Sequence, residues 1–464
     1  MVTSRRTRPV PLCGHNRPWN GHGYTVAGES VRSWRPPGSL VGDDVVFDQS
    51  GGMVLLLAFA AVLLLAVLLS SLAHRSILST AVVFLLAGIL LGPDTTGVLN
   101  ITADSDLVAT LAELALFTVL FTDGMRVGFA DLRLAWRLPG RALGWGLPLT
   151  LLITAVLAHY VAGLDWPEAL LVGAVLAPTD PVFAAALVGN VGVPGRLRHL
   201  LNVESGINDG LALPFVILFL AIAAGSDDLH LDELGIELLL GLLIGVAVPW
   251  LALWMEKGRF FSASTKYEPL NGVAIGLLVL ALGLITHANL FLAAFAAGVT
   301  VATFGQRQRE SFEHFGELIA EVFKLAALLV FGALISVEFL SEINWTGWVF
   351  AVLAIVVARP LALAVSFLGS QLSRTEQFAA MWFGPKGFAS VVYGLLVLQA
   401  GIAAGDEVFH LVALTVVLSI LAHSSTDVLI ARIFDPATTP QWYERLRAAS
   451  ADRRERRGDG DQPP

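Results

Sequence analysis

The sequence predicts an all-α polytopic membrane protein with about thirteen transmembrane helices, built as an inverted-topology repeat with two broken helices. Of its 464 residues, 55% are hydrophobic and only 14% are charged, whereas an ordinary soluble domain has roughly a quarter charged residues. Apolar runs of about 20 residues recur along the chain, and each can cross a ~30 Å hydrocarbon layer as a helix. Two of these runs are interrupted at corresponding places. The composition argues against a water-soluble enzyme and against a nucleic-acid-binding protein.

The two ends of the chain differ from its apolar middle. Residues 1–52 are rich in Arg, Pro and Gly and contain no apolar h-region, so we expect them to be disordered and not a signal peptide. Because Met53 opens an uninterrupted apolar run, we interpret residues 1–52 as an extension upstream of the true start. Residues 53–431 are the predicted transmembrane domain, and 432–464 a charged cytoplasmic tail. The one cysteine, Cys13, cannot form an internal disulfide, and no Cys/His cluster has zinc spacing, so we expect no cofactor.

Each predicted span is a continuous apolar run between charged loops. The spans are 53–72, 77–91, 106–123, 142–161, 168–190, 203–224, 234–254, 270–286, 289–304, 320–340, 347–370, 377–400 and 408–431. Loops rich in Arg and Lys alternate with loops rich in Asp and Glu. Because basic loops remain in the cytoplasm, this pattern puts the C-terminus in the cytoplasm and the start of the first span outside.

The fifth and twelfth spans contain helix breakers together with a charge. The fifth has Pro178-Thr179-Asp180-Pro181 in its middle, and the twelfth has Gly-Pro-Lys-Gly at 384–387. Either could be an ordinary kinked helix. However, the two spans are seven apart and therefore run in opposite directions, as an inverted repeat requires. Paired interrupted spans are the best sequence indication of a transporter's binding site. There Asp180 could compensate helix N-termini and Lys386 helix C-termini.

The sixth span begins with a polar segment that contains Glu204, Asn208 and Asp209. Glu204 and Asn208 are four residues apart and share a helix face. The alternative is an acidic helix N-terminus at the membrane interface. A carboxylate in an apolar, confined site is costly to ionise, so it is either protonated or paired with a cation. Such a site holds a proton or a small cation in turn, which is an exchange mechanism.

Three other ionisable residues lie inside predicted spans. Glu113 is a lone acid in the third span and could be a further oxygen ligand or the partner of a buried cation. Arg359 in the eleventh span requires a carboxylate partner from another helix. Lys324 in the tenth span is either part of the core or extends to the cytoplasmic interface. Oxygen ligands suit Na⁺ or K⁺, and no sulfur ligand lies near these acids.

Thr179-Asp180-Pro181, followed by the Glu-Ser-Gly-Ile-Asn-Asp segment at 204–209, resembles the paired signature of the monovalent cation/proton antiporter superfamily, specifically its sodium/proton exchanger branch. The resemblance covers roughly residues 53–431. It implies a thirteen-helix, inverted-repeat transporter with a core domain, in which the broken fifth and twelfth spans cross, and a separate dimerisation domain. Similar proteins are homodimers in the lipid bilayer that work by an elevator movement of the core.

The resemblance also implies roles for individual residues. Asp209 would be the carboxylate shared by protons and the cation. Thr179 and Ser205 would offer oxygen ligands, and Glu113 matches the acid that some members place near the ion. Asp180 would support the broken helices or the ion.

Further matches concern the surrounding polar residues. Glu204 and Arg359 match a buried structural ion pair. Asn208 implies electroneutral exchange, because members with Asn before the carrier Asp are generally electroneutral. Two positions depart from the pattern: Lys324 stands where relatives of this branch usually carry an uncharged residue, and Lys386 lies in a Gly-Pro-Lys-Gly break where Gly-Arg-Gly is commoner. Electrogenic relatives do have a lysine in the tenth span, which works against the conclusion from Asn208.

The predicted function is therefore exchange of Na⁺, or of K⁺ or Li⁺, for protons across the plasma membrane. One alternative is a K⁺/H⁺ antiporter for potassium efflux or pH control. Another is an ion channel or a membrane sensor on the same fold. A channel would need a pore without obligatory proton coupling, and a sensor would need a folded regulatory domain. We do not expect an enzyme, because no nucleophile with a base and an orienting group is placed in a site.

Overall fold

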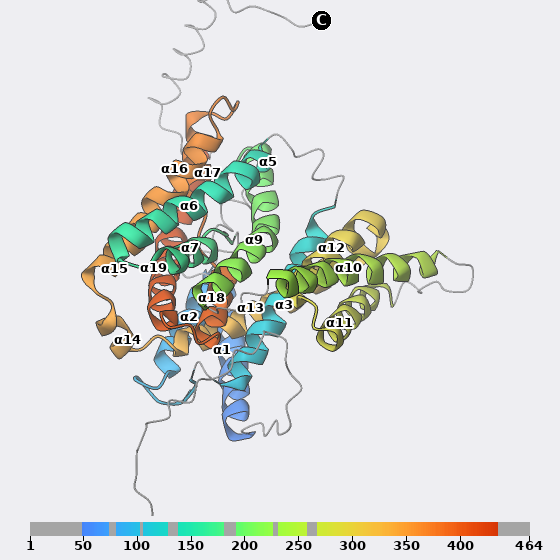
Figure 1. Ribbon diagram of the computed structural model, residues 1–464, viewed down its shortest axis with the longest axis horizontal. Helices are drawn as coiled ribbons and strands as arrows, with labels where there is room; N and C mark the ends of the chain where they lie inside the picture. The colour runs from blue at the N-terminus through green and yellow to red at the C-terminus, as the bar shows by residue number, and fades with distance from the viewer. Residues whose placement is uncertain are drawn as a thin grey trace, which may run out of the picture. The chain divides into compact units, whose positions relative to one another are not determined.

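The computed structural model describes residues 49–73, 80–102, 105–128, 138–180, 192–225, 231–257 and 267–434, and these residues form helices and no strands. The all-helical class is therefore confirmed (Figure 1). Most of the predicted extension at 1–52 and nearly all of the tail at 432–464 lie outside the described residues. The first helix begins at Gln49, four residues before Met53, and the start at Met53 remains a prediction. A turn of polar residues continues the helix beyond its apolar part.

The helices of the first half of the chain follow the first six predicted spans. They are α1 (Gln49–Ala73), α2 (Thr80–Leu91), α3 (Asp106–Arg126), α5 (Pro139–Arg141), η1 (Ala142–Gly146), α6 (Leu147–Leu157), η2 (Ala158–Ala162), α7 (Trp166–Val175) and α9 (Gly195–Ala223). From α5 to η2 the helix is continuous, with two π-helical stretches.

The second half continues the series. Its helices are α10 (Leu231–Glu256), α11 (Glu268–Thr286), α12 (Leu290–Phe304), α13 (Gln306–Ala333), α14 (Val337–Glu342), α15 (Trp345–Leu353), η4 (Ala354–Ala358), α16 (Arg359–Ser366), α17 (Arg374–Trp382), α18 (Phe388–Gln399), α19 (Gly405–Ala431) and η5 (Arg432–Phe434). The tenth span lies earlier in the chain than predicted: the expected range is 320–340, whereas the helix α13 begins at Gln306 and ends at Ala333. The chain bends by 117° between α12 and the start of α13.

By length and apolar composition, 8 helices of the described part can cross a membrane, or up to 9 if the bent pair counts as one span. Three shorter apolar helices, α2, α7 and α18, have 12, 10 and 12 residues. Two of these, α7 and α18, adjoin the predicted helix breaks. A total of thirteen spans therefore remains a prediction.

The helices form two groups that pack mainly within themselves. In one, α3 packs against α12 and α13, and α10 and α11 pack against α12. In the other, α7 lies between α6 and α9, while α15 and α18 pack against α19 (Figure 1). The groups meet where α3 contacts α9 and α18, and where α13 contacts α18. This junction contains the polar residues described below.

A pair of facing glycines brings α3 and α12 into backbone contact. A Cβ atom on Gly124 would lie 2.5 Å from the carbonyl oxygen of Phe295, and one on Gly298 would lie 2.2 Å from that of Phe121. Small residues allow membrane helices to approach this closely. The contact fixes the end of α3 that carries Asp123.

Candidate cation and proton site

Two non-helical stretches lie beside each other in the second group of helices. Helix α7 ends at Val175, and α17 ends at Trp382, five residues before Gly387 and the start of α18. The backbone N–H of Asp180 donates to the carbonyl oxygen of Pro385 at 3.0 Å. In return, the backbone N–H of Phe388 donates to Oδ2 of Asp180 at 3.3 Å. The described part of the fifth predicted span ends at Asp180, and residues 181–190 of that span lie outside the described residues.

Lys386 is buried within this crossing. Its Nζ lies 3.5 Å from the carbonyl oxygens of Ala177 and Pro178, which follow the end of α7. Carbonyl groups at a helix C-terminus lack helical partners and carry partial negative charge, so a lysine ammonium is a favourable neighbour.

Glycine is required at two positions of the twelfth-span break. A Cβ atom on Gly387 would lie 2.1 Å from Cβ of Asp180, and a Cβ atom on Gly384 would lie 1.7 Å from Nε of Arg359. The glycines therefore allow both charged residues to sit directly against the backbone.

Asn208 joins α9 to the fifth-span break. Its Nδ2 donates to Oγ1 of Thr179 at 2.8 Å and to the carbonyl oxygen of Thr179 at 3.3 Å. Because α9 begins at Gly195, Asp209 lies roughly four turns into the helix. The expectation that these residues occupy the first two turns is wrong, and with it the alternative of an acidic helix N-terminus. The reason is that the mixed polar and apolar residues from Gly195 onward extend the helix.

Asp209 is buried, and its Oδ1 has no hydrogen-bond partner among the residues that the structure describes. Its backbone carbonyl oxygen accepts a hydrogen bond of 2.8 Å from the hydroxyl of Tyr393 on α18. A buried carboxylate oxygen without a partner is unfavourable unless a proton or a cation satisfies it. Asp209 is therefore the group on which a transported ion could bind.

Ser205 and Glu204 occupy the same helix, one turn before Asp209. The hydroxyl of Ser205 donates to the carbonyl oxygen of Leu201 at 2.8 Å, so its oxygen lone pairs are its contribution to any ion site. Glu204 accepts two hydrogen bonds from Arg359, of 2.7 and 3.1 Å, and both side chains are buried. Arg359 also donates to the carbonyl oxygen of Phe383, at 3.2 Å.

Sequence reasoning missed Asp123, which lies on α3 opposite this site. It is buried and pairs with Arg126 at 3.3 Å. A Cβ atom on Gly206 of α9, three residues before Asp209, would lie 3.8 Å from the backbone carbonyl oxygen of Asp123. The sequence signal that could have identified Asp123 was an acidic residue in the last turn of the third apolar span. Tyr393, the hydroxyl partner of Asp209, was also missed.

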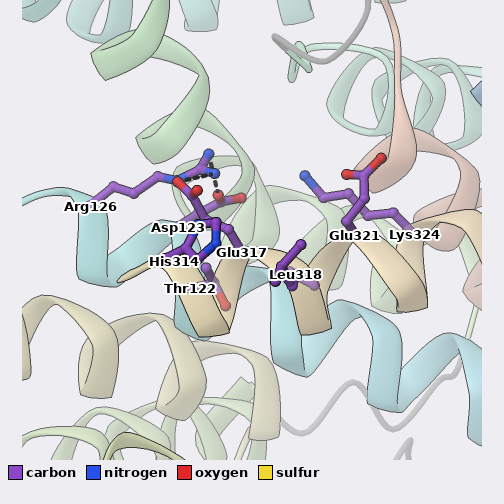
Figure 2. A pocket seen from close by; sticks show the side chains of 9 residues that line it. Thr122, Asp123, Arg126, His314, Glu317, Leu318, Glu321 and Lys324 are labelled. Carbon is purple, nitrogen blue, oxygen red and sulfur yellow. Dashed lines mark hydrogen bonds and ion pairs between the residues drawn. The ribbon is translucent and has the colours of Figure 1, made fainter. Parts of the chain in front are cut away.

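A polar cavity of about 250 Å³ lies between α3 and α13. Figure 2 shows Asp123, Arg126 and Glu317 together at one end, where Arg126 also pairs with Glu317 at 3.1 Å. Glu321 and Lys324 lie at the other end. The side chain of Lys324 is buried, with the residue 9% exposed. Lys324 is thus a buried member of the charged cluster that lines this cavity.

Glu113 is not brought to this cluster. It is half-buried on α3, roughly three turns or about 15 Å along the helix axis from Asp123. Because Glu113 and Asp123 lie on one straight helix, this separation keeps Glu113 away from the crossing.

The sequence profile of the family described as "Sodium/hydrogen exchanger, transmembrane" matches residues 60–431. The chain belongs to this family. The predicted membership of the cation/proton antiporter superfamily is therefore confirmed. The match covers both helix groups of this exchanger-family protein and both crossing stretches.

Curated relatives of this family member carry antiporter names. The K(+)/H(+) antiporter NhaP2 of Shewanella sp. (strain ANA-3) is 28% identical over 380 residues, which are 79% of this chain and 65% of the relative. The K(+)/H(+) antiporter NhaP of Alkalimonas amylolytica is 26% identical over 371 residues, covering 79% and 64%. The chain thus spans slightly less than two thirds of the length of these relatives.

The fold resembles that of a solved exchanger-family structure. The sodium proton antiporter MjNhaP1 from Methanocaldococcus jannaschii, solved at pH 8, matches with a TM-score of 0.66 and 20% identity. The match covers 82% of this chain and 98% of that chain. At this identity the likeness shows that the two chains share a fold.

Proposed function

We propose that the protein is a secondary antiporter, and not an enzyme, that exchanges a monovalent cation for protons across the plasma membrane. The observation that carries the proposal is the buried, unpartnered Oδ1 of Asp209 beside the Asn208–Thr179 hydrogen bonds. In the protonated state the carboxyl group is neutral. In the other state a bound Na⁺ or K⁺ neutralises it, so the two ions compete for one side chain.

The cation would bind to Asp209 with oxygen ligands from its neighbours. Thr179 offers its hydroxyl and carbonyl oxygens, both of which lie within reach of Asn208. The lone pairs of Ser205 are a further ligand. Asp180 is held by Phe388 and contributes negative charge, while Asp123 does so from the opposite group of helices. Asp123 therefore replaces Glu113 as our proposed acid from the third span.

Movement of one helix group against the other would carry the loaded site across the membrane. We propose that α6, α7, α9 and α15–α19 form the moving core and that α1–α3 and α10–α13 form the dimerisation domain of a homodimer. The helix contacts, which are dense within each group and sparser between them, support this division. The proposed transporter has thirteen spans arranged as an inverted repeat, with its C-terminus in the cytoplasm.

The transported ion is proposed to be Na⁺, with K⁺ as the second candidate because the named relatives are K(+)/H(+) antiporters. Hard oxygen ligands accept either ion. Asn208 bonds to Thr179 through its neutral amide, and this supports an exchange of one cation per proton.

The decisive experiment is transport in proteoliposomes that contain a pH-sensitive dye, after addition of Na⁺, K⁺ or Li⁺. We expect the wild type to move protons in response to at least one of these ions and Asp209→Asn to move none. An Asp209→Asn variant that exchanges normally would overturn the mechanism. Proton movement that does not require a counter-cation would instead favour the channel.

A further inference from the structure

Helix α19 presents three polar side chains on one face, at 419, 423 and 426, toward the break between α17 and α18. Residues spaced by four and three positions share a helix face. Ser419 and His423 are buried. The ion-site residues above do not explain them, since neither contacts Asp209, Asp180 or Thr179 among the described contacts.

Each of the three side chains holds a group on the α17–α18 segment. Oγ of Ser419 accepts a hydrogen bond of 2.8 Å from the backbone N–H of Lys386. Nε2 of His423 lies 2.9 Å from the carbonyl oxygen of Trp382, the last residue of α17. Oγ1 of Thr426 accepts a hydrogen bond of 2.9 Å from the indole Nε1–H of Trp382.

Two of these partners are backbone groups at the helix break, and the Trp382 carbonyl oxygen also accepts a hydrogen bond of 3.0 Å from the backbone N–H of Gly384. The Trp382 carbonyl ends a helix, and the Lys386 N–H precedes one. In a membrane interior such groups have no water to bind, so each requires a protein partner. The face of α19 supplies a donor for the first and an acceptor for the second.

The ring of His423 serves this purpose in two of its three protonation forms. With the proton on Nε2, it donates to Trp382 and accepts from the Ser419 hydroxyl, whose Oγ is 3.1 Å from Nδ1. With both nitrogens protonated, it donates to Trp382 and to the Ser419 carbonyl oxygen, 2.7 Å away. Each singly protonated form leaves one ring lone pair against a carbonyl oxygen: that of Nδ1 against Ser419 when the proton is on Nε2, and that of Nε2 against Trp382 when it is on Nδ1. The bond to Trp382 is common to the two forms that carry a proton on Nε2.

We infer that Ser419, His423 and Thr426 form a clasp that positions the twelfth-span break, and that His423 and Ser419 are positioning residues for cation binding. The clasp holds Trp382 and Lys386, which bracket the break. Lys386 and Pro385 in turn contact the stretch that ends in Thr179 and Asp180. A change in the clasp is thus transmitted through the crossing to the ligands around Asp209.

The effect of the clasp on cation binding rests on the proposed function, and the test separates the two. We would measure the apparent KM and Vmax for Na⁺ and K⁺ in proteoliposomes for His423→Phe, His423→Gln and Ser419→Ala. Thr415→Val is the matched control, because Thr415 is also buried on α19 and, within the described part of the chain, its hydroxyl bonds only to Leu411 of its own helix. Amide hydrogen exchange of the peptide over 383–388 is measured in parallel and does not depend on transport.

We expect His423→Phe to raise the apparent KM about fivefold, the equivalent of one neutral hydrogen bond, with Vmax little changed. His423→Gln, which can still donate to Trp382, should recover most of the wild-type KM. Ser419→Ala should raise the KM and accelerate exchange at 383–388, whereas Thr415→Val should change neither.

A wild-type KM in folded His423→Phe, or equal effects of Ser419→Ala and Thr415→Val, would overturn the clasp. If His423→Phe does not fold, the comparison of the two hydroxyl variants decides. If the wild type shows no exchange, the proposed function fails, and protection of 383–388 still tests whether the clasp holds the break.

Discussion

The guanidinium of Arg359 donates hydrogen bonds to both carboxylate oxygens of Glu204 and to the carbonyl oxygen of Phe383. One side chain on α16 thereby joins α9, which carries Asp209, to the end of α17, where the twelfth-span break begins. The Arg359 and Glu204 side chains are only 5% and 6% exposed. The pair therefore sets the distance between the carboxylate helix and the break.

Removal of Arg359 should destabilise the protein strongly. In Arg359→Ala, the buried Glu204 carboxylate loses both donors, and breaking one partner of a buried pair costs roughly 3–5 kcal/mol. We expect low expression and a clear fall in the detergent-solubilised Tm. The double variant Arg359→Leu with Glu204→Leu should be less destabilised than the sum of the single variants, because it leaves no unpaired charge.

Arg307 provides the control for this prediction. It pairs with Glu268, and its own side chain is 67% exposed whereas that of Glu268 is 6% exposed. Glu268 keeps the hydrogen bond from Ser311, so Arg307→Ala should cost less than Arg359→Ala. Equal losses of Tm for Arg359→Ala and Arg307→Ala would show that the Glu204 pair is not a structural link.

Gly387 should not tolerate even a methyl group. In Gly387→Ala the new Cβ would lie 2.1 Å from Cβ of Asp180, so the two breaks must separate. We expect exchange in proteoliposomes to fall at least tenfold, because the ligands beside Asp209 move with Asp180. Gly144→Ala is the control, since a Cβ there meets nothing within 4 Å. Normal transport by Gly387→Ala would mean that the crossing adapts freely.

Asp123 is predicted to strengthen cation binding from the opposite helix group. Asp123→Asn keeps the shape of the side chain but removes a buried negative charge on α3, which contacts the helix of Asp209. We expect the apparent KM for the cation to rise about fivefold, the equivalent of roughly 1 kcal/mol of screened attraction. Thr122→Val, in the same cavity and hydrogen-bonded only to its own helix, should leave the KM unchanged. Identical KM values for the two variants would remove Asp123 from the proposed site.

Sequence reasoning could locate the crossing because its causes are local. Two prolines flank Thr179-Asp180, and two glycines flank Pro385-Lys386. Each of these short segments disfavours a continuous helix, whatever the rest of the chain does. The same argument placed Asp209 beside the break, only one residue after Asn208. An arginine in an apolar helix must find an acid, so Arg359 could also be recognised as a buried, paired charge.

The missing parts depend on how distant helices pack. Asp123 lies at the end of an apolar span, where an interfacial acid is ordinary, and only the contact of α3 with α9 brings it to Asp209. Glu113 had the stronger sequence signal because apolar residues surround it, yet it is roughly three turns away on the same helix. His423 and Ser419 resemble ordinary polar residues of a helix until the break is placed against them.

Lys324 allows the stoichiometry to be tested directly. This lysine is buried and lines the same cavity as Asp123. If Asn208 indicates one cation per proton, each exchange cycle moves no net charge. The cation gradient at which net exchange stops should then be the same at every clamped membrane potential. If Lys324 carries a second proton, this balance point should depend on the potential.

We expect the balance point to be independent of voltage in the wild type and in Lys324→Met. Because the variant removes a positive charge near the cation, its apparent KM for the cation should fall roughly fivefold, the equivalent of about 1 kcal/mol of screened repulsion. Leu325→Met, a neighbouring buried change without loss of charge, is the control. A voltage-dependent wild type that becomes voltage-independent in Lys324→Met would instead make Lys324 a proton carrier, and the conclusion from Asn208 would then be wrong.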